Sequence, residues 1–275
     1  MPMEIDLSAE HELVGIDDTT QSIYRVCEIS RLIDVFVNKS LSLTRPKLWD
    51  DPYENFLRYA IGIYKYNDEE IHQSYDYLSN EIFGQCWTLN IENDATWRIY
   101  SPGSDRVKVK TTVEKLFNFM KRFTDNGLYS YIGKVTYDKQ ENIISKISRA
   151  IKNKSPYTLS PFDLASLVKN YYLVKRDVFD YEKEVRLIVS LPPKPENYIN
   201  AKYKDSKNLD ICNLPLDDPE DFFDEIVFDP RIPDSLVRAF TSYFKSDLKY
   251  NNNIYKSTLY EKPYVREKVK SIFGK

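Results

Sequence analysis

The chain has few of the residues that build the commonest phosphate, zinc and disulfide sites. Its 275 residues include only seven glycines and no Gly-x-Gly fingerprint, which argues against a glycine-rich loop that cradles phosphate. The three cysteines, Cys27, Cys86 and Cys212, lie far apart in the sequence. This spacing argues against a structural zinc site and a disulfide framework, and it is typical of a reducing compartment.

Histidine and long apolar runs are also scarce. His11 and His72 are the only histidines. The chain therefore offers almost no histidine side chains for a histidine-based zinc site or a catalytic triad. No apolar run resembles a signal peptide or reaches the length of a membrane span. The formal net charge of −3 gives no global basic field for nucleic acid. We therefore expect a soluble cytoplasmic protein with no membrane partner and no bound metal.

The residues that are plentiful predict a folded core. Hydrophobic residues make up 42% of the chain, and the aromatic residues include 22 tyrosines. Strand-like and helix-like segments are mixed, which predicts an α+β fold in a single mixed domain, with a split, mostly antiparallel sheet flanked by helices. We assign residues 1–20 to a flexible N-terminal arm, 21–260 to the domain with a candidate helical insert at 138–170, and 261–275 to a basic C-terminal tail.

The densest group of charges beside a hydrophobic run lies at residues 179–189. Val185–Val189 is typical of a buried strand. Glu182, Glu184 and Arg186 follow one another at a spacing of two, which places them on one face of an extended strand. On periodicity alone they also fit the solvated face of an edge strand.

Seven short motifs are spread along the chain. They are Tyr24-Arg25, Arg45-Pro46, Asp50–Glu54, Cys86-Trp87-Thr88, Trp97–Tyr100, Tyr181–Arg186 and Asp229-Pro230-Arg231. In this order they resemble the bacterial family named domain of unknown function 2971, over roughly residues 22–260. Some members of that family resemble components of abortive-infection systems against phage. The resemblance therefore implies a toxin-like effector of antiviral defence, or a partner protein within a defence operon.

A weaker similarity, at the level of pattern, connects the chain with NAD-dependent ADP-ribosyltransferases. Those enzymes use a split sheet with an Arg or His on a first strand, a Ser, Thr or Tyr on a second, and a Glu, often within Glu-x-Glu, at the start of a later strand. Arg25, Thr88 and Glu184 occur in this order. The similarity implies an ADP-ribosyltransferase-like fold, NAD as co-substrate, a protein or nucleic-acid target, and no metal.

The roles implied for these residues follow the chemistry of the nicotinamide–ribose bond. Breaking this bond develops oxocarbenium character, which the Glu184 carboxylate would stabilise while it holds the ribose hydroxyls. The Arg25 guanidinium offers a planar fork of donors for pyrophosphate or ribose, and Thr88 would orient Arg25 or Glu184. Aromatic residues such as Trp97 or Tyr100 suit stacking on nicotinamide or adenine. The binding candidates are Tyr24, Asp51, Trp97, Tyr100, Glu182 and Arg186.

Structural explanations stay open for several of these residues. Arg25 pairs with Glu184 for stability alone in one interpretation. In the corresponding structural interpretations, Trp97 and Tyr100 are core residues, and Asp51 is the cap of a helix that starts at Pro52.

Two other functions stay open as well. One is a metal-dependent nuclease, with the basic segment 139–154 facing nucleic acid and Mg²⁺ held by a carboxylate cluster. The carboxylates of that cluster are Asp50, Asp51, Glu54, Glu182 and Glu184. The other is a non-catalytic antitoxin or sensor that binds a partner protein through a tyrosine-rich surface.

Overall fold

The fold is built on one large sheet, seen in a computed structural model that describes residues 11–76, 79, 82–123, 129–151, 171–190 and 210–263. Its strands are β1 (His11–Val14), β2 (Ser22–Glu28), β3 (Ser40–Thr44), β6 (Ile82–Thr88), β7 (Arg106–Thr112), β8 (Tyr129–Lys134), β11 (Glu184–Ser190), β12 (Ile211–Pro215), β13 (Glu225–Phe228) and β14 (Asn253–Lys256). The order along the sheet is β1-β8-β11-β6-β2-β7-β13-β14, and β12 pairs with β3, which joins β6. Only the β1–β8 and β13–β14 pairs of this sheet are parallel.

The sheet divides between β2 and β6. These strands pair at a single position, Tyr24 with Thr88, whereas β2 pairs with β7 along its whole length from Ser22 to Glu28. The β6 strand pairs in the same continuous way with β11. Two well-paired halves therefore diverge from one shared point, and the predicted α+β class with a split, mostly antiparallel sheet is confirmed.

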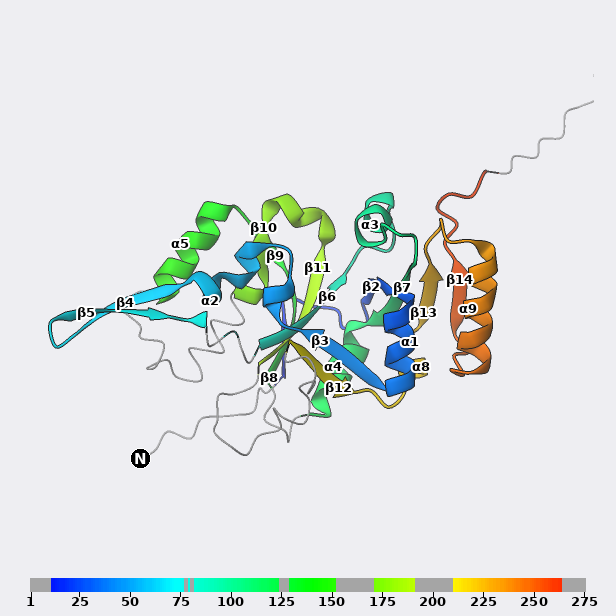
Figure 1. Cartoon of the computed structure of the whole chain (residues 1–275), viewed down its shortest axis with the longest axis horizontal. Helices are drawn as coiled ribbons and strands as arrows, with labels where there is room; N and C mark the ends of the chain where they lie inside the picture. The colour runs from blue at the N-terminus through cyan, green and yellow to red at the C-terminus, as the bar shows by residue number, and fades with distance from the viewer. Residues whose placement is uncertain are drawn as a thin grey trace, which may run out of the picture.

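Helices flank the sheet (Figure 1). They are α1 (Ile29–Asn38), α2 (Phe56–Tyr59), α3 (Asp94–Tyr100), α4 (Val113–Lys121), α5 (Gln140–Ile151), α8 (Pro219–Phe222) and α9 (Asp234–Ser246), with the 3₁₀ turns η1 (Pro46–Leu48), η2 (Pro52–Asn55) and η6 (Asp177–Glu182). In α1 the apolar spacing of three and four residues buries Ile29, Leu32 and Phe36. The Asn93 side chain begins α3 by accepting a hydrogen bond from the Thr96 N–H at 2.7 Å.

The strand β11 lies at the centre of the sheet and is buried on both faces. Val185, Leu187 and Val189 belong to the main core, which also contains residues of α1 and α4. Ile188 points to the other face, into a second apolar cluster with residues of α5. Because β11 lies between β8 and β6, it is not an edge strand. The polar side chains that share the face of Ile188 are therefore buried instead of solvated.

Two small sheets stand beside the large one. Strand β9 (Thr136–Asp138) pairs in parallel with β10 (Val174–Arg176), and β4 (Ile61–Tyr66) pairs with β5 (Glu69–Ser74). Figure 1 shows the β4–β5 hairpin extending away from the rest of the chain, and β9 and β10 lying next to β11. The position of β9 and β10 next to β11 is important for the candidate site.

Several predicted boundaries can be compared with the structure. The segment predicted as a flexible arm includes His11–Val14, which form β1 against β8, so the arm prediction is wrong for these four residues. The candidate insert contains α5, as expected of a helical segment, while its residues 152–170 lie outside the described part. The tail from residue 264 also lies outside it. Among the described residues, no helix combines the length and the apolar character needed to cross a membrane.

Gly84 on β6 gives a prediction about packing next to the split. A Cβ atom at this position would lie 2.7 Å from Cζ2 of Trp49 and 3.0 Å from Cδ1 of Ile188. We expect Gly84→Ala to lower the free energy of unfolding by about 1–3 kcal/mol, measured by urea denaturation. The matched control is Gly103→Ala, where a Cβ would meet only the Asp105 side chain and the change should stay within about 0.5 kcal/mol. Equal stability of the two variants would show that Trp49 is not packed on β6.

Candidate active site

Three neighbouring strands bring Tyr24, Thr88 and Glu184 into one row. Thr88 on β6 pairs with Tyr24 on β2 and with Glu184 on β11, and paired residues of antiparallel strands place their side chains on the same face. The row lies at the split, where β2 and β6 separate. A break in the pairing at this point leaves room between the two halves of the sheet.

A pocket of about 250 Å³ occupies the region of the split. Its lining includes the three residues predicted to be catalytic, Arg25, Thr88 and Glu184. It also includes three of the predicted binding residues, Tyr24, Tyr100 and Glu182. The structure therefore brings six of the nine predicted site residues to one cavity.

Arg25 has no carboxylate partner. Its guanidinium forms no hydrogen bond or ion pair within the described residues, and burial lowers the pKa of the Arg25 side chain below its ordinary value. The carboxylate of Glu184 pairs with Lys175 and Arg186, and no ion pair joins it to Arg25. The interpretation in which Arg25 pairs with Glu184 for stability is therefore wrong. A half-buried guanidinium without a partner is suited to an anionic ligand.

Glu184 is held by two cations at the start of β11. Its carboxylate accepts a hydrogen bond from Nε of Arg186 at 2.5 Å and one from Nζ of Lys175 at 2.9 Å. Its backbone N–H donates to the Tyr137 hydroxyl at 2.8 Å. Only 7% of Glu184 is exposed, so these charge-assisted contacts form largely away from water, where they are strongest.

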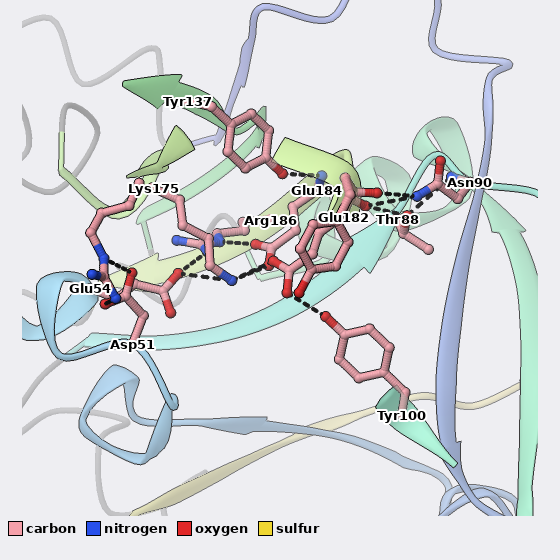
Figure 2. A network of polar contacts seen from close by, with 12 residues as sticks. Asp51, Glu54, Thr88, Asn90, Tyr100, Tyr137, Lys175, Glu182, Glu184 and Arg186 are labelled. Atoms are coloured by element: carbon pink, nitrogen blue, oxygen red, sulfur yellow. Dashed lines mark hydrogen bonds and ion pairs between the residues drawn. The ribbon is translucent and has the colours of Figure 1, made fainter. Parts of the chain in front are cut away.

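Glu182 reaches the same site by a different backbone route. It ends η6, and Lys183 follows with a left-handed φ of 46°, so the predicted extended strand begins only at Glu184. The Glu182 carboxylate forms an ion pair with Lys175 and accepts a hydrogen bond from the Tyr100 hydroxyl at 2.6 Å. Its backbone carbonyl accepts a hydrogen bond from the Thr88 hydroxyl at 2.5 Å. Figure 2 shows the two carboxylates side by side, with Tyr100 approaching from below.

Thr88 therefore holds the turn before β11 instead of touching Arg25. Its hydroxyl donates to the Glu182 carbonyl and accepts the Asn90 N–H at 3.1 Å. The Asn90 amide adds a hydrogen bond to the Tyr181 carbonyl at 2.7 Å. These hydrogen bonds fix the backbone that carries the two glutamates, whereas the predicted role was to orient Arg25 or Glu184.

Buried carboxylates outnumber buried cations in this network. Glu54, Glu182 and Glu184 face Lys175 and Arg186, three negative groups against two positive ones, so full ionisation leaves one unit of negative charge. Two unit charges 4 Å apart interact with about 4 kcal/mol at the effective dielectric of a protein surface. One carboxylate is therefore expected to bind a proton more readily than the others.

The pKa values of the two pocket carboxyls move in opposite directions. Burial, followed by the hydrogen bond with Glu184, raises the pKa of Glu182 to about 7. Burial also acts to raise the pKa of Glu184, but Arg186, Glu182 and Lys175 together outweigh it and hold this pKa below its ordinary value. Near neutral pH the pair therefore consists of an ionised Glu184 and a Glu182 that gains or loses a proton.

Three predicted binding residues do not line the pocket. Trp97 is fully buried and its indole N–H donates to Glu92 at 2.6 Å, so it belongs to the core. Asp51 caps η2 by accepting the Tyr53 N–H at 3.0 Å, and it pairs with Arg176. Arg186 is fully buried behind Glu184. Each of these three supports the fold around the pocket, and none of them is part of its lining.

Sequence reasoning missed Lys175, Tyr137 and Trp49, and it considered Glu54 only as a candidate metal ligand. Lys175 and Glu54 complete the ion pairs of the glutamates, and Tyr137 binds the backbone of Glu184. Trp49 lines the pocket and lies under the Arg186 guanidinium, whose carbon is 4.7 Å from the ring centroid. A sequence signal existed for Glu54, which ends the motif Asp50–Glu54; Lys175 and Tyr137 lie in no motif.

Comparison with known proteins finds two kinds of similarity. The model of a family described as a protein of unknown function (DUF2971) matches residues 96–187, so the resemblance is confirmed over this third of the chain, which carries the motifs Trp97–Tyr100 and Tyr181–Arg186. The predicted wider span of residues 22–260 is not matched in full. A search of the curated proteins finds no match.

The second similarity is to solved structures of DarT from Thermus sp. 2.9. The complex with carba-NAD+ aligns with a TM-score of 0.34 and 10% identity, covering 87% of this chain and 96% of DarT. The complexes with NAD+ and with ADP-ribosylated ssDNA each align with a TM-score of 0.35 and 8% identity, and with nearly the same coverage. At this level of similarity the function has to be argued from the site itself.

The raised pKa of Glu182 gives a prediction about stability. A carboxyl whose pKa is higher in the folded protein stabilises the fold at low pH, and this contribution disappears as the pH rises through the folded-state pKa. From pH 5 to pH 8 the free energy of unfolding of the wild type should fall, relative to Glu182→Gln, by on the order of 1–3 kcal/mol. Urea denaturation at both pH values measures the difference. The exposed Glu114→Gln should track the wild type, and a flat difference for Glu182→Gln would contradict the assignment.

Proposed function

We propose that this protein cleaves NAD at the nicotinamide–ribose bond and transfers ADP-ribose to a macromolecule, on an ADP-ribosyltransferase-like split sheet. The observation that carries the proposal is the convergence of Arg25, Thr88 and Glu184, from three neighbouring strands, on one pocket at the split. The pattern that suggested these residues in the sequence did not require them to meet in space.

The unpaired guanidinium fits the pyrophosphate of NAD. Arg25 lies in the pocket wall with no competing carboxylate in the described residues. The planar fork of a guanidinium suits two phosphate oxygens. The pocket also presents the tyrosine rings of Tyr24 and Tyr100, which offer apolar surface for the bases of a dinucleotide.

The ionised Glu184 fits the reacting ribose. As the bond between ribose C1′ and the nicotinamide nitrogen breaks, its electron pair leaves with the nicotinamide and positive charge develops on the ribose. A carboxylate that stays ionised stabilises this charge. Arg186 and Lys175 keep Glu184 ionised and fix its direction, so little reorganisation is needed when the charge develops.

Glu182 fits the removal of a proton from the acceptor. The acceptor atom bonds to C1′ and loses its proton, and a carboxylate whose pKa lies near neutral pH takes up that proton efficiently. The Tyr100 hydroxyl donates to Glu182 and orients it. The surroundings shift the pKa values of the two carboxyls in opposite directions, so Glu184 stabilises the positive charge and Glu182 takes up the proton. Water in the place of the acceptor would give hydrolysis of NAD.

The alternative of a Mg²⁺-dependent nuclease has less support from the geometry. Asp51 is paired with Arg176, Glu54 with Arg186, and Glu182 with Lys175. With Glu184, which pairs with Lys175 and Arg186, side-chain cations therefore already pair with four of the five carboxylates of the cluster. No group of three or more His, Cys, Asp or Glu side chains in the described segments is arranged to hold a metal ion.

The family resemblance extends the proposal to a cellular role. We propose that the transfer takes place in the cytoplasm, where NAD is available, and that it serves defence against phage as an abortive-infection effector. The non-catalytic antitoxin is the competing role. It differs from the effector in that it would not need the pocket carboxylates.

The first test of the proposal is nicotinamide release from NAD by the purified chain. We expect Glu184→Gln to lower the rate by about 10²–10³-fold, because it removes the negative charge opposite the developing oxocarbenium. Arg25→Ala should mainly raise KM, since its contact with the pyrophosphate forms before the reaction. The exposed Glu114→Gln is the matched control and should react like the wild type. The function is wrong if folded Glu184→Gln releases nicotinamide as fast as the wild type.

The second test concerns the acceptor and the role in cells. Labelled NAD should modify a cell protein extract or a nucleic acid in the presence of the wild type and not of Glu184→Gln, with single-stranded DNA included as one acceptor. Cells that carry the wild-type gene should reduce phage plaque numbers, and cells with Glu184→Gln should not. Protection by Glu184→Gln equal to that of the wild type would favour the non-catalytic role.

A further inference from the structure

The small β9–β10 sheet touches the catalytic strand at a buried lysine. Lys175 on β10 is 7% exposed, and its ammonium contacts the Glu184 carboxylate at 2.9 Å, the Glu54 carboxylate at 3.6 Å and the Glu182 carboxylate. The ammonium donates hydrogen bonds to Glu182 and Glu184 and forms a longer ion pair with Glu54. The same ammonium also lies over the Phe179 ring, with Nζ 4.7 Å from the ring centre.

The position of Lys175 relative to the pocket separates it from the groups that would touch substrate. Glu182 and Glu184 line the pocket and Lys175 does not. Figure 2 shows the ammonium in contact with both carboxylates, although Lys175 itself is not part of the pocket lining. A group in this place acts on a substrate only through the carboxylates that it holds.

The same small sheet makes two more contacts with the surroundings of the site. Tyr137 on β9 accepts the hydrogen bond of the Glu184 N–H at 2.8 Å. Arg176, next to Lys175 on β10, forms a bidentate pair with Asp51 at 2.9 and 3.2 Å. Together these contacts fix β10 at a defined distance from β11 and from η2, which places the Lys175 ammonium where the two glutamates meet.

Without this ammonium the two carboxylates have no common partner. Arg186 reaches Glu184 and Glu54 but forms no contact with Glu182. Loss of Lys175 would leave three carboxylates facing one cation. Carboxylates that share a site repel one another, so one of them either binds a proton or moves away from the others.

We propose that Lys175 is the positioning residue of this site: its ammonium, delivered by the β9–β10 sheet, holds the carboxylates of Glu182 and Glu184 together in the pocket wall in their working arrangement. The kinetic part of this role rests on the proposed function, while the electrostatic part does not. In this role of Lys175, the β9–β10 sheet completes the active site that is built on the large sheet.

The charged and titratable groups around the glutamate pair come from seven elements, η6 included. They are Lys175 on β10, Arg186 on β11, Glu54 on η2, Tyr100 on α3, Tyr137 on β9 and Cys86 on β6, with Tyr181 next to Glu182 in the chain. Among them only Lys175 contacts both carboxylates of the pair. A change confined to Lys175 therefore tests this proposal without altering the other groups.

The experiment follows the carboxyl groups in the ligand-free protein. Glutamate labelled with ¹³C at the side-chain carboxyl is titrated by NMR in the wild type, Lys175→Met and Lys175→Arg, with the signal of Glu184 assigned by its loss in Glu184→Gln. We expect Lys175→Met to move the titration of Glu184 to higher pH by about one to two units. Lys175→Arg should restore the wild-type value, because it keeps the charge.

Nicotinamide release is the second readout. The acid limb of its pH profile should move upward in Lys175→Met by the same interval, with a fall in kcat of about 10–100-fold and a smaller change in KM. The matched control is Lys146→Met, which removes a lysine of α5 that pairs with Asp138 of β9 and is 55% exposed at its side chain. It should leave both readouts unchanged.

A double variant covers the case in which Lys175→Met does not fold. Lys175→Met combined with Glu182→Gln leaves two carboxylates and one cation, the same net charge of one negative unit as three carboxylates and two cations. The titration of Glu184 in this double variant, compared with Glu182→Gln alone, should again move upward by about one unit or more.

The outcomes separate the two proposals. An unchanged Glu184 titration after loss of Lys175, in the single or the double variant, overturns the positioning role. If the titration moves as expected while the wild type releases no nicotinamide, the proposed function fails and the positioning of the carboxylates by Lys175 stands. If the wild type releases nicotinamide and Lys175→Met shows the same pH profile at lower stability only, Lys175 has a purely structural role.

Discussion

The fully buried guanidinium of Arg186 is the constraint on which the rest of the site depends. A charge inside a protein is tolerated only when hydrogen-bonded counter-charges surround it. Arg186 satisfies this condition with Glu184 from its own strand, with Glu54 from η2, and with the Tyr172 carbonyl at 3.0 Å. The indole of Trp49 lies against its plane. Because the partners come from separate parts of the chain, Arg186 fixes where a loop, a strand and an aromatic ring must meet. Loss of Arg186 would leave Glu54 and Glu184 with Lys175 as their one shared cation.

This requirement explains why two distant motifs occur together in the sequence. The motif Asp50–Glu54 and the motif Tyr181–Arg186 are separated by more than half of the domain, yet Glu54 pairs with Arg186, and Asp51 pairs with Arg176 just ahead of η6. The first supplies counter-charges for the second, and the second supplies the carboxylates of the pocket. A pattern that looks like two sites in the sequence is one ionic unit in the structure.

The sequence predicted the class of the fold, the centre of the site and its order along the chain. Alternation and helix spacing depend on local chemistry, so β2, β6, α1 and the apolar half of β11 could be predicted from their own residues. The burial of Trp97 and the cap at Asp51 were open alternatives, because a single sequence does not show which aromatic ring reaches a cavity. Lys175 and Tyr137 were missed because their role arises from β10 and β9 lying next to β11, a tertiary contact that leaves no periodic signal. The prediction of β1 as a loose arm failed for the same reason: His11–Val14 is a strand only because β8 offers an edge.

The two arginines near the split illustrate how the structure separates stability from binding. Arg186 and Arg25 lie on strands separated only by β6, and both are withdrawn from water to a large extent. Arg186 is surrounded by carboxylates, and these neighbours raise its pKa against the effect of burial. Arg25 has no such neighbours in the described residues, and burial lowers its pKa. A guanidinium kept in the wall of a pocket without a counter-charge destabilises the free protein, and an anionic ligand removes that penalty when it binds. The contrast within one sheet is therefore the physical reason to place the anion of a substrate at Arg25, and the chemistry of the substrate at the carboxylates that Arg186 and Lys175 hold.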